Sequence, residues 1–354
     1  MKKLISKIFG TQQSGIIMVI LLLGVVLTIF SGSHPDRATG AQVNNFLNQY
    51  TLMQTATDAS FFAIMAIGAT IVIISGGIDL SVGSIYAFAG VISAMVLRAM
   101  GPMDSVPTLL TALTLCVGIG LACGLANGLM IVGLRVHPFI ITLGTMWIFR
   151  GIAFVASKAE SILIPDCLTG FTKATFGLGT LYPVPMLIMI ASTVIGAIYL
   201  SKTVMGRHVY AIGGNADASR YSGLKVGRIT TGVYVVSGLT AGIAAFVGTT
   251  YYGSASCADA TGYELYVIAS AVVGGTSLSG GKGSAISAMF GAVLIILIRQ
   301  SIRTLHLDQN YEWIIIGLAI IIAVVLDQIN ARLTSRRLLK SVAEKQNIET
   351  IKSK

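Results

Sequence analysis

Charged residues are scarce in this sequence: Asp, Glu, Lys and Arg make up only 11% of the 354 residues, whereas 54% are hydrophobic. A soluble domain needs about 25% charged residues to cover its surface. The composition therefore excludes a soluble globular protein and indicates an integral membrane protein. In a soluble protein the net charge of +10 would suggest nucleic acid. Here the basic residues are placed as expected from membrane topology, so we expect no nucleic-acid partner.

Residues that carry catalysis or hold metals are also few. The four histidines are scattered among different segments, and the 14 acidic residues lie mostly in loops. No His–acid–Ser or paired-carboxylate arrangement can be assembled from them. The cysteines show no CxxC or CxxH spacing, which argues against a metal site or a disulfide framework. They are Cys116, Cys123, Cys167 and Cys257. The sequence therefore predicts neither an enzyme nor a metalloprotein.

A glycine-rich stretch at 274–284, Gly-Gly-Thr-Ser-Leu-Ser-Gly-Gly-Lys-Gly-Ser, superficially resembles a nucleotide-binding loop. The register of that motif fails, because Thr276 stands where its first glycine belongs and Gly283 follows Lys282 in place of Ser or Thr. The stretch also follows an apolar run and not a strand. We expect that this chain does not hydrolyse ATP and binds no cofactor.

What the chain has in abundance is apolar runs of about 20 residues, the length that crosses a bilayer as a helix. They predict an all-α, polytopic transmembrane bundle of about ten spans. The predicted spans are 15–31, 59–75, 84–100, 107–132, 138–156, 183–200, 230–250, 263–275, 284–302 and 311–328. One membrane domain, 15–328, would lie between a cytoplasmic amino-terminal segment 1–14 and a basic cytoplasmic tail 329–354.

The basic residues indicate the orientation. With the amino terminus inside, 17 of the 24 Lys and Arg residues fall on the cytoplasmic side and seven on the external side. This bias follows the positive-inside rule and places both termini in the cytoplasm. Alternatively, the first run could be a cleaved signal peptide, because small residues at 31–33 follow it. The other nine spans keep their orientation in either case.

The longest polar interruption, residues 202–228, carries five basic residues and lies on the predicted cytoplasmic side. It predicts a short helix, broken from the preceding chain by Gly213 and Gly214, capped by Asn215 and ended by Gly223. A capped basic helix between two spans is either a simple connection or a docking surface for a partner.

Two glycine-rich segments echo each other and suggest an internal repeat. Gly76-Gly-Ile-Asp-Leu-Ser-Val-Gly83 and Gly274-Gly-Thr-Ser-Leu-Ser-Gly-Gly281 share Gly, Gly, Leu, Ser and a final Gly. One interpretation is turn and capping chemistry, with Asp79 or Ser81 capping the third span and Ser277 or Ser279 the ninth. The other is irregular backbone along a water-filled path. The candidate path residues here are Asp79, Ser81, Thr276 and Ser277.

Further polar residues interrupt the fourth and fifth spans. Gly120, Gly124 and Gly128 recur at intervals of four, which predicts close helix packing, as do Gly238 and Gly242 in the seventh span. Asn127 lies beside this stripe and needs a partner within the bundle. Thr142, Thr145, Trp147 and Arg150 run along the fifth span. We include Asn127, Thr145 and Arg150 as candidate path residues, with interfacial anchoring or packing as the alternative role.

Several motifs together resemble the permeases of sugar-type ABC importers for ribose, arabinose and xylose. The resemblance runs from about residue 60 to 328. Its motifs are Gly76 to Gly83, Asn127-Gly128 with Pro138-Phe-Ile-Ile-Thr-Leu-Gly144, Arg150-Gly151, the loop with Gly206-Arg207 and Ala211-Ile-Gly-Gly-Asn-Ala216, and Thr261-Gly-Tyr-Glu-Leu265 before Gly274-Gly-Thr-Ser-Leu. The family position after Leu265 usually carries an acid in ribose-type permeases, and Tyr266 stands there instead, which leaves the particular sugar open.

The resemblance implies a type II importer permease fold in a bacterial inner membrane. It implies a second permease chain, an external or periplasmic sugar-binding protein, and a separate cytoplasmic ATPase that holds ATP and Mg²⁺. The ATPase would dock on the loop 202–228. The docking residues implied are Arg207, Gly213, Gly214, Asn215, Arg220 and Gly223. The alternatives are an ion-gradient-driven secondary transporter, which would need intramembrane acids that the spans mostly lack, and a channel or scaffold without energy coupling.

Overall fold

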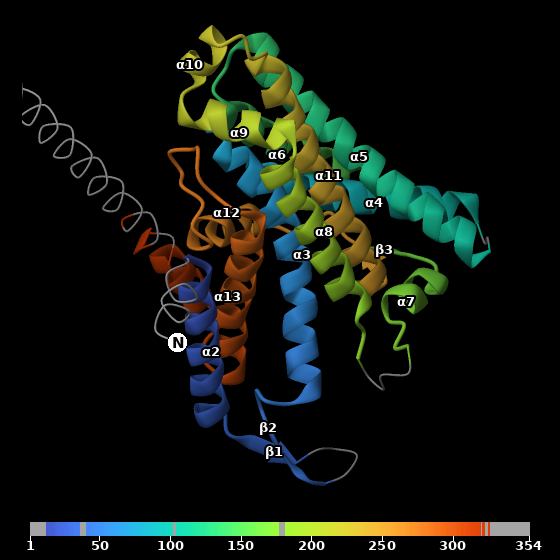
Figure 1. Cartoon of the computed structure of the whole chain (residues 1–354). Helices are drawn as coiled ribbons and strands as arrows, with labels where there is room; N and C mark the ends of the chain where they lie inside the picture. The colour runs from blue at the N-terminus through green and yellow to red at the C-terminus, as the bar shows by residue number, and fades with distance from the viewer. Residues whose placement is uncertain are drawn as a thin grey trace, which may run out of the picture.

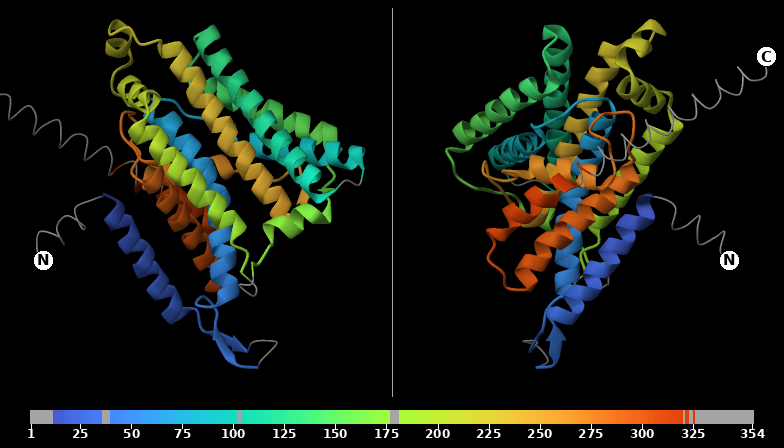
Figure 2. Two further views of the ribbon diagram at one scale, coloured as in Figure 1. Left: turned by 45° about the vertical axis from the view of Figure 1, so that its right-hand side comes forward. Right: turned by 90° about the vertical axis from the view of Figure 1, so that its left-hand side faces the viewer.

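The computed structural model describes residues 12–35, 40–101, 104–176, 181–319, 321, 322 and 325, which form a helical bundle with a few very short strands (Figures 1 and 2). The helices are α2 Gln12–Phe30, α3 Gln49–Ile74, α4 Val82–Met100, α5 Ser105–Leu134, α6 Pro138–Ser157, α7 Asp166–Thr172, α8 Val184–Lys202, α9 Val204–Gly214, α10 Ala216–Tyr221, α11 Val226–Tyr252, α12 Tyr263–Val273 and α13 Ala285–Thr304. The predicted tail 329–354 and nearly all of segment 1–14 lie outside these residues.

Seven of the described helices are long and apolar enough to cross a membrane: α3, α4, α5, α6, α8, α11 and α13. They confirm an all-α membrane bundle. The predicted first span corresponds to α2, which is apolar over Ser14–Phe30. The predicted span 263–275 is α12, whose 11 residues are too few for a full crossing. Of the span 311–328, residues 311–319 are helical. The structure thus supports a multi-span bundle but not the count of ten.

One predicted boundary was wrong by ten residues. The second span was expected from residue 59, but α3 begins at Gln49. Asn48 starts the helix, because its side-chain oxygen accepts a hydrogen bond from the Thr51 amide at 2.8 Å. The first turns of α3 carry polar residues such as Gln54 and Asp58, which hydropathy alone assigns to a loop.

Helix α3 forms the centre of the bundle. Its most apolar 18-residue window is entirely buried. Phe61, Phe62, Ile64 and Met65 are each 2% exposed or less. A helix that is apolar on all sides is stable only when other helices surround it. In Figure 1, α8, α11 and α13 lie around α3.

The predicted glycine stripe is confirmed as a packing feature between α5 and α11. A Cβ atom on Gly120 would overlap the Gly238 carbonyl oxygen, and one on Gly242 would overlap the Cys116 carbonyl oxygen. The two backbones are therefore in direct contact, which only glycine permits at these positions.

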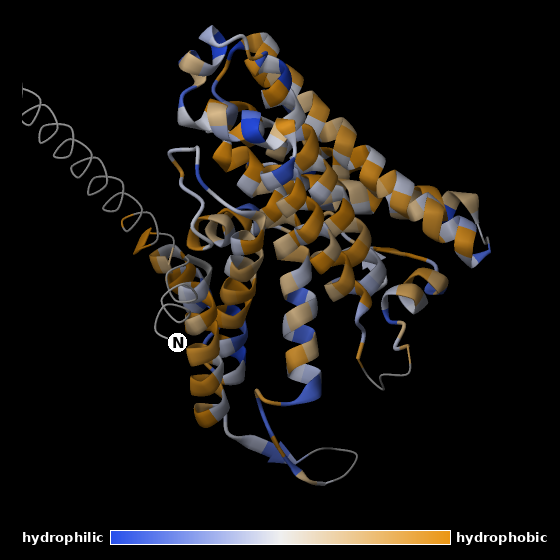
Figure 3. Cartoon of the chain, viewed as in Figure 1, coloured by the Kyte–Doolittle hydropathy of each residue, from blue (hydrophilic) through white to orange (hydrophobic). Residues whose placement is uncertain are grey.

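The polar parts of the chain lie at the ends of the bundle. Figure 3 shows hydrophilic residues on α9 and α10 at one end and on the β1–β2 hairpin at the other. Strands β1 (Ser33–Pro35) and β2 (Gln42–Asn44) pair antiparallel, as do β3 (Ile162–Leu163) and β4 (Ser254–Ala255). The bundle therefore has an α9–α10 end and a hairpin end.

Candidate functional site

The polar loop 202–228 folds into two short helices, α9 and α10. The predicted capped helix is α10: the Asn215 side chain accepts a hydrogen bond from the Ala218 amide at 2.9 Å, and Gly223 follows the helix with φ +86°. The preceding residues were predicted incorrectly. Gly213 and Gly214 are the last two residues of α9, which Thr203 caps through the Gly206 amide at 3.0 Å. The loop therefore contains two helices joined at Asn215.

Gly213 holds the end of α9 against two other segments. A Cβ atom there would overlap the Ile74 carbonyl oxygen at the end of α3 and would come within 2.6 Å of the Gly281 amide nitrogen. Those two groups also bond to each other, because the Gly281 amide donates to the Ile74 oxygen at 2.8 Å. Nothing lies within 4 Å of the corresponding position on Gly214. The end of α9 therefore contacts both α3 and the loop after α12.

Two further contacts fix α9. Tyr210 donates from its hydroxyl to the Gly283 carbonyl at 2.8 Å. Val209 and Ile212 are buried at 0% and 5% exposure. One face of α9 is thus anchored in the bundle. The predicted docking residues Arg207, Gly214, Asn215, Arg220 and Gly223 are all exposed. They lie on the adjoining helices α9 and α10 and at the ends of these helices, whose exposed residues we call the α9–α10 surface.

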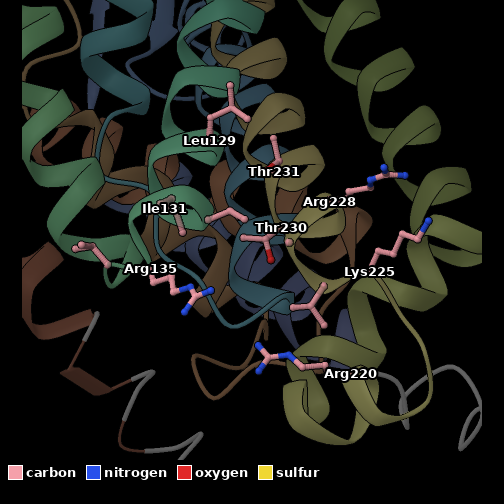
Figure 4. A pocket seen from close by; sticks show the side chains of 12 residues that line it. Leu129, Ile131, Arg135, Arg220, Lys225, Arg228, Thr230 and Thr231 are labelled. Carbon is pink, nitrogen blue, oxygen red and sulfur yellow. The ribbon is translucent and has the colours of Figure 1, made fainter.

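A pocket of about 1120 Å³ lies beside the α9–α10 surface, between the α5–α6 connection and the start of α11 (Figure 4). Arg135, Arg220, Lys225 and Arg228 line it, and no acidic residue does. Within the described part of the chain, none of the four has an ion pair or a side-chain hydrogen bond. Arg135 ends α5 in the left-handed conformation, with φ +55° and ψ +35°. The pocket is therefore suited to an anionic group.

Sequence reasoning placed only Arg220 of this set in a site. Lys225 and Arg228 are two of the five basic residues of the loop 202–228, and Arg135, in a different connection, is another of the 17 basic residues on the predicted cytoplasmic side. The positive charge that these residues share can be read from the sequence. Their proximity cannot be predicted from it, because it depends on how the α5–α6 connection packs against α11.

Three predicted path residues form a buried network at the start of α4. Asp79 is 2% exposed. One of its carboxylate oxygens accepts hydrogen bonds from the Ser81 amide at 2.9 Å and hydroxyl at 2.6 Å, and the other accepts from the Ser237 hydroxyl at 2.7 Å. The Asn127 amide donates to the Ser81 hydroxyl at 2.8 Å. Sequence reasoning missed Ser237, which lies on α11 and becomes adjacent only in the fold.

Burial raises the pKa of Asp79, and the hydrogen bonds from Ser81 and Ser237 partly oppose that shift. Ser81 is the N-cap of α4, but its side chain makes no capping bond. Asp79 instead accepts from the Ser81 backbone amide. The network joins the α3–α4 connection to α5 and α11 and leaves the carboxylate almost fully buried, so its geometry is that of a structural brace.

The other predicted path residues make their own contacts outside this network. Thr145 is buried and bonds the Thr142 carbonyl at 3.3 Å. Arg150 donates to the carbonyls of Cys257, Asp259 and Ala260 and so holds the loop between β4 and α12. Thr276 is 1% exposed and Ser277 is 7% exposed, in the loop after α12. Trp147 is 69% exposed on the outer surface.

The bundle of apolar helices, with a pair of short exposed helices at one end, defines the class of multi-pass membrane proteins. The chain belongs to the family described as branched-chain amino acid transport system / permease component, whose model matches residues 51–324. The family confirms that this chain is a transport permease subunit, as the motifs predicted, and not an enzyme.

Relatives of known name match most of the chain. The D-allose transport system permease protein AlsC of Escherichia coli (strain K12) is 34% identical over 310 residues, which cover 87% of this chain and 90% of the relative. The ribose import permease protein RbsC of Bacillus subtilis (strain 168) is 33% identical, with 90% and 93% covered. The inner membrane ABC transporter permease protein YjfF of Escherichia coli (strain K12) is 38% identical, with 74% and 78% covered.

Proposed function

We propose that this chain is the transmembrane subunit of an ATP-driven ABC importer that moves a monosaccharide or a related polyhydroxylated solute across a bacterial inner membrane. The ribose and D-allose permeases among its relatives support this substrate class. In this proposal a second permease chain completes the membrane unit and a sugar-binding protein delivers the solute externally. A cytoplasmic ATPase holds the ATP and Mg²⁺, and both termini of this chain lie in the cytoplasm.

The contact at Gly213 carries the proposal. Its backbone lies against the Ile74 carbonyl of α3 and the Gly281 amide of the loop after α12. Helix α3 is the buried centre of the bundle. Tightly packed protein interiors transmit strain. A displacement of the α9–α10 surface would therefore be passed on to the segments that Gly213 contacts. A partner that pushes on this surface would move α3 and that loop together.

The charge of the adjacent pocket indicates the chemistry of the ATPase contact. Arg135, Arg220, Lys225 and Arg228 surround a space without a lining acid. An ATPase that places acidic side chains there would gain speed and specificity of association from the complementary charge. Closure of the ATPase on ATP would then bias the bundle between inward-open and outward-open states, and the nucleotide would set the populations.

The test uses the permease reconstituted in proteoliposomes with its ATPase and binding protein. Arg220→Glu reverses one charge at the pocket, and Arg98→Glu reverses an exposed charge at the end of α4 as a matched control. We expect Arg220→Glu to reduce ATP-dependent uptake of radiolabelled D-ribose and D-allose at least about tenfold, equivalent to about 1.4 kcal/mol. Co-purification of the ATPase should weaken, and Arg98→Glu should change neither quantity.

Gly223→Val tests the same docking role through the backbone. Gly223 has φ +86°, which a β-branched residue adopts only with strain. We expect this variant to insert into the membrane normally and to lose coupling between ATP hydrolysis and uptake. Normal uptake in both Arg220→Glu and Gly223→Val would remove the docking role. Uptake that needs an ion gradient and proceeds without ATP would favour a secondary transporter.

A further inference from the structure

A second cavity, of about 270 Å³, lies far from the α9–α10 surface. Its lining comes from the first half of α3, the ends of α11 and α13, and the start of α12. Asp58 in this lining precedes Ile74 by 16 residues of continuous helix, which at 1.5 Å per residue is about 24 Å. The cavity therefore belongs to the hairpin end of the bundle, whereas the ATPase is proposed to bind at the α9–α10 end.

The cavity combines hydrogen-bonding groups with aromatic rings. Its charged and amide side chains are Gln54, Asp58, Arg299 and Arg303, and Tyr252 and Tyr263 add hydroxyl groups. Phe61 and Phe62 are 2% and 1% exposed, and Tyr252, 54% exposed, also lines the cavity. Small-molecule sites typically place a few directed polar groups among aromatic side chains. A volume just below the usual lower limit of about 300 Å³ for drug-sized ligands suits a smaller solute.

Asp58 is the centre of the polar lining. Its Oδ1 accepts hydrogen bonds from the Tyr252 hydroxyl and from the Gln54 amide, both at 2.9 Å. Its Oδ2 lies 3.7 Å from Nη1 of Arg303. Residues on three helices thus orient one carboxylate, which retains acceptor capacity because each oxygen can accept two hydrogen bonds. Sequence reasoning missed Asp58 because it placed the start of the span at residue 59.

The charges of the cavity are balanced in pairs. Arg303 faces Asp58, and Arg299 forms an ion pair at 2.9 Å with Glu312. Glu312 also accepts a hydrogen bond from Tyr266, where the chain departs from the ribose-type pattern, and Arg299 stands 5.6 Å from the Tyr266 ring centre. A charged solute would find no unpaired counter-charge here. An uncharged solute with many hydroxyl groups would find both donors and acceptors.

A water-filled path would explain why this cluster of polar side chains lies within a membrane-spanning bundle. Charged side chains at membrane depth are costly unless they pair or line a water-filled cavity. The Arg303 side chain is 41% exposed, so the cavity opens to the surface of this chain. We propose that it is a solute-contact site on the import path, in which Asp58 accepts hydrogen bonds from sugar hydroxyls, Gln54 and Arg303 donate to them, and the aromatic rings pack on the apolar face of the sugar. This assignment rests on the proposed function.

The test uses the complete transporter in proteoliposomes with radiolabelled D-ribose, D-allose and D-xylose. Asp58→Asn and Tyr252→Phe change the cavity. Asp308→Asn and Tyr50→Phe are matched controls at exposed positions outside it. We expect both cavity variants to co-purify with the ATPase, to slow uptake at least about tenfold and to change the order of preference among the three sugars. A general structural defect would slow all three sugars equally. The controls should match the wild type.

The outcomes separate this inference from the proposed function. If the wild-type complex transports none of the three sugars with ATP, the proposed function fails. If it transports a sugar and both cavity variants keep its rate and preference, the cavity assignment alone fails. Gln54→Cys gives a readout independent of turnover, because a membrane-impermeant maleimide added outside should label it and the transported sugar should slow that labelling. Labelling that is absent or insensitive to sugar would overturn the assignment.

Discussion

Residues 76–83 and 274–281 share a sequence pattern, and the structure shows how far the likeness extends. Helix α3 ends with the Gly76 amide bonded to the Ile73 carbonyl at 2.9 Å and the Gly77 amide bonded to the Val72 carbonyl at 3.0 Å. Helix α12 ends in the same way, with the Gly275 amide donating to Val272 at 2.8 Å and the Thr276 amide to Ala271 at 2.9 Å. Both pairs of bonds form a Schellman motif.

The structural equivalence differs from the sequence echo by one residue. Gly76 and Gly275 occupy the same left-handed position, with φ +87° and +91°. The sequence pattern instead pairs Gly76 with Gly274, which has φ −61°. The shared glycines therefore specify how a helix stops, and they do not make the following residues equivalent.

The two segments diverge after the helix ends. In the first, Asp79 is closed in by Ser81 and Ser237 and ties α4 to α11. In the second, Gly280 and Gly281 have φ of +82° and +72° and lie against the end of α9. The first segment is an internal brace, and the second contacts α9, which forms part of the proposed docking surface. The two loops have similar glycine patterns but different roles, because they contact different segments of the bundle.

The largest effect should come from Gly213, whose close approach joins the end of α3, just before the first segment, to Gly281 in the second segment. Gly213→Ala would force apart α9, the Ile74 carbonyl and the Gly281 amide, and overpacking of this kind costs about 3 kcal/mol. We expect a lowered midpoint of thermal unfolding in detergent and loss of ATP-dependent uptake. The adjacent Gly214→Ala is the control and should stay within about 0.5 kcal/mol of the wild type. Equal behaviour of the two variants would refute the close contact.

A somewhat smaller effect is expected at the first segment. Asp79→Ala leaves the Ser81 and Ser237 hydroxyls buried without their acceptor. Unsatisfied buried polar groups cost about 1–3 kcal/mol each. We expect a destabilisation of about 2 kcal/mol, measured by thermal unfolding, with ATPase co-purification retained because α9 is not touched. If Asp79→Ala instead impaired sugar uptake at unchanged stability, Asp79 would belong to the path and not to a brace.

The smallest effect should come from Thr276 in the second segment. Its hydroxyl is buried and has no hydrogen-bond partner among the residues that the structure describes. Thr276→Val keeps the shape of the side chain and removes this hydroxyl, which contributes no hydrogen bond to stability. We expect a change within about 0.5 kcal/mol, or slight stabilisation. A loss of uptake at unchanged stability would show that a solute or water uses this hydroxyl during transport.

The membrane helices and the capped helix were predictable because their causes are local. Continuous apolar runs produced α4, α5 and α11, and the amide-to-side-chain bond of Asn215 needs only residues 215–218. The start of α3 was not predictable by hydropathy, because Gln54 and Asp58 are tolerated there only through contacts with α11 and α13. The identity of α9 as a second helix was missed because Gly213 and Gly214 are usually helix breakers, whereas here both lie within the helix and Gly213 serves a close contact.

For this protein the sequence by itself determined a multi-span helical body, its glycine-to-glycine helix contact and a capped basic helix, since each follows from local patterns of polarity, size and turn chemistry. Only the tertiary structure decided that Gly213 lies between Ile74 and Gly281, that four basic residues share one pocket, and that Asp58 meets Tyr252 and Arg303. Those groups come from segments far apart in the chain, and their distances depend on how whole helices pack, which no local pattern encodes.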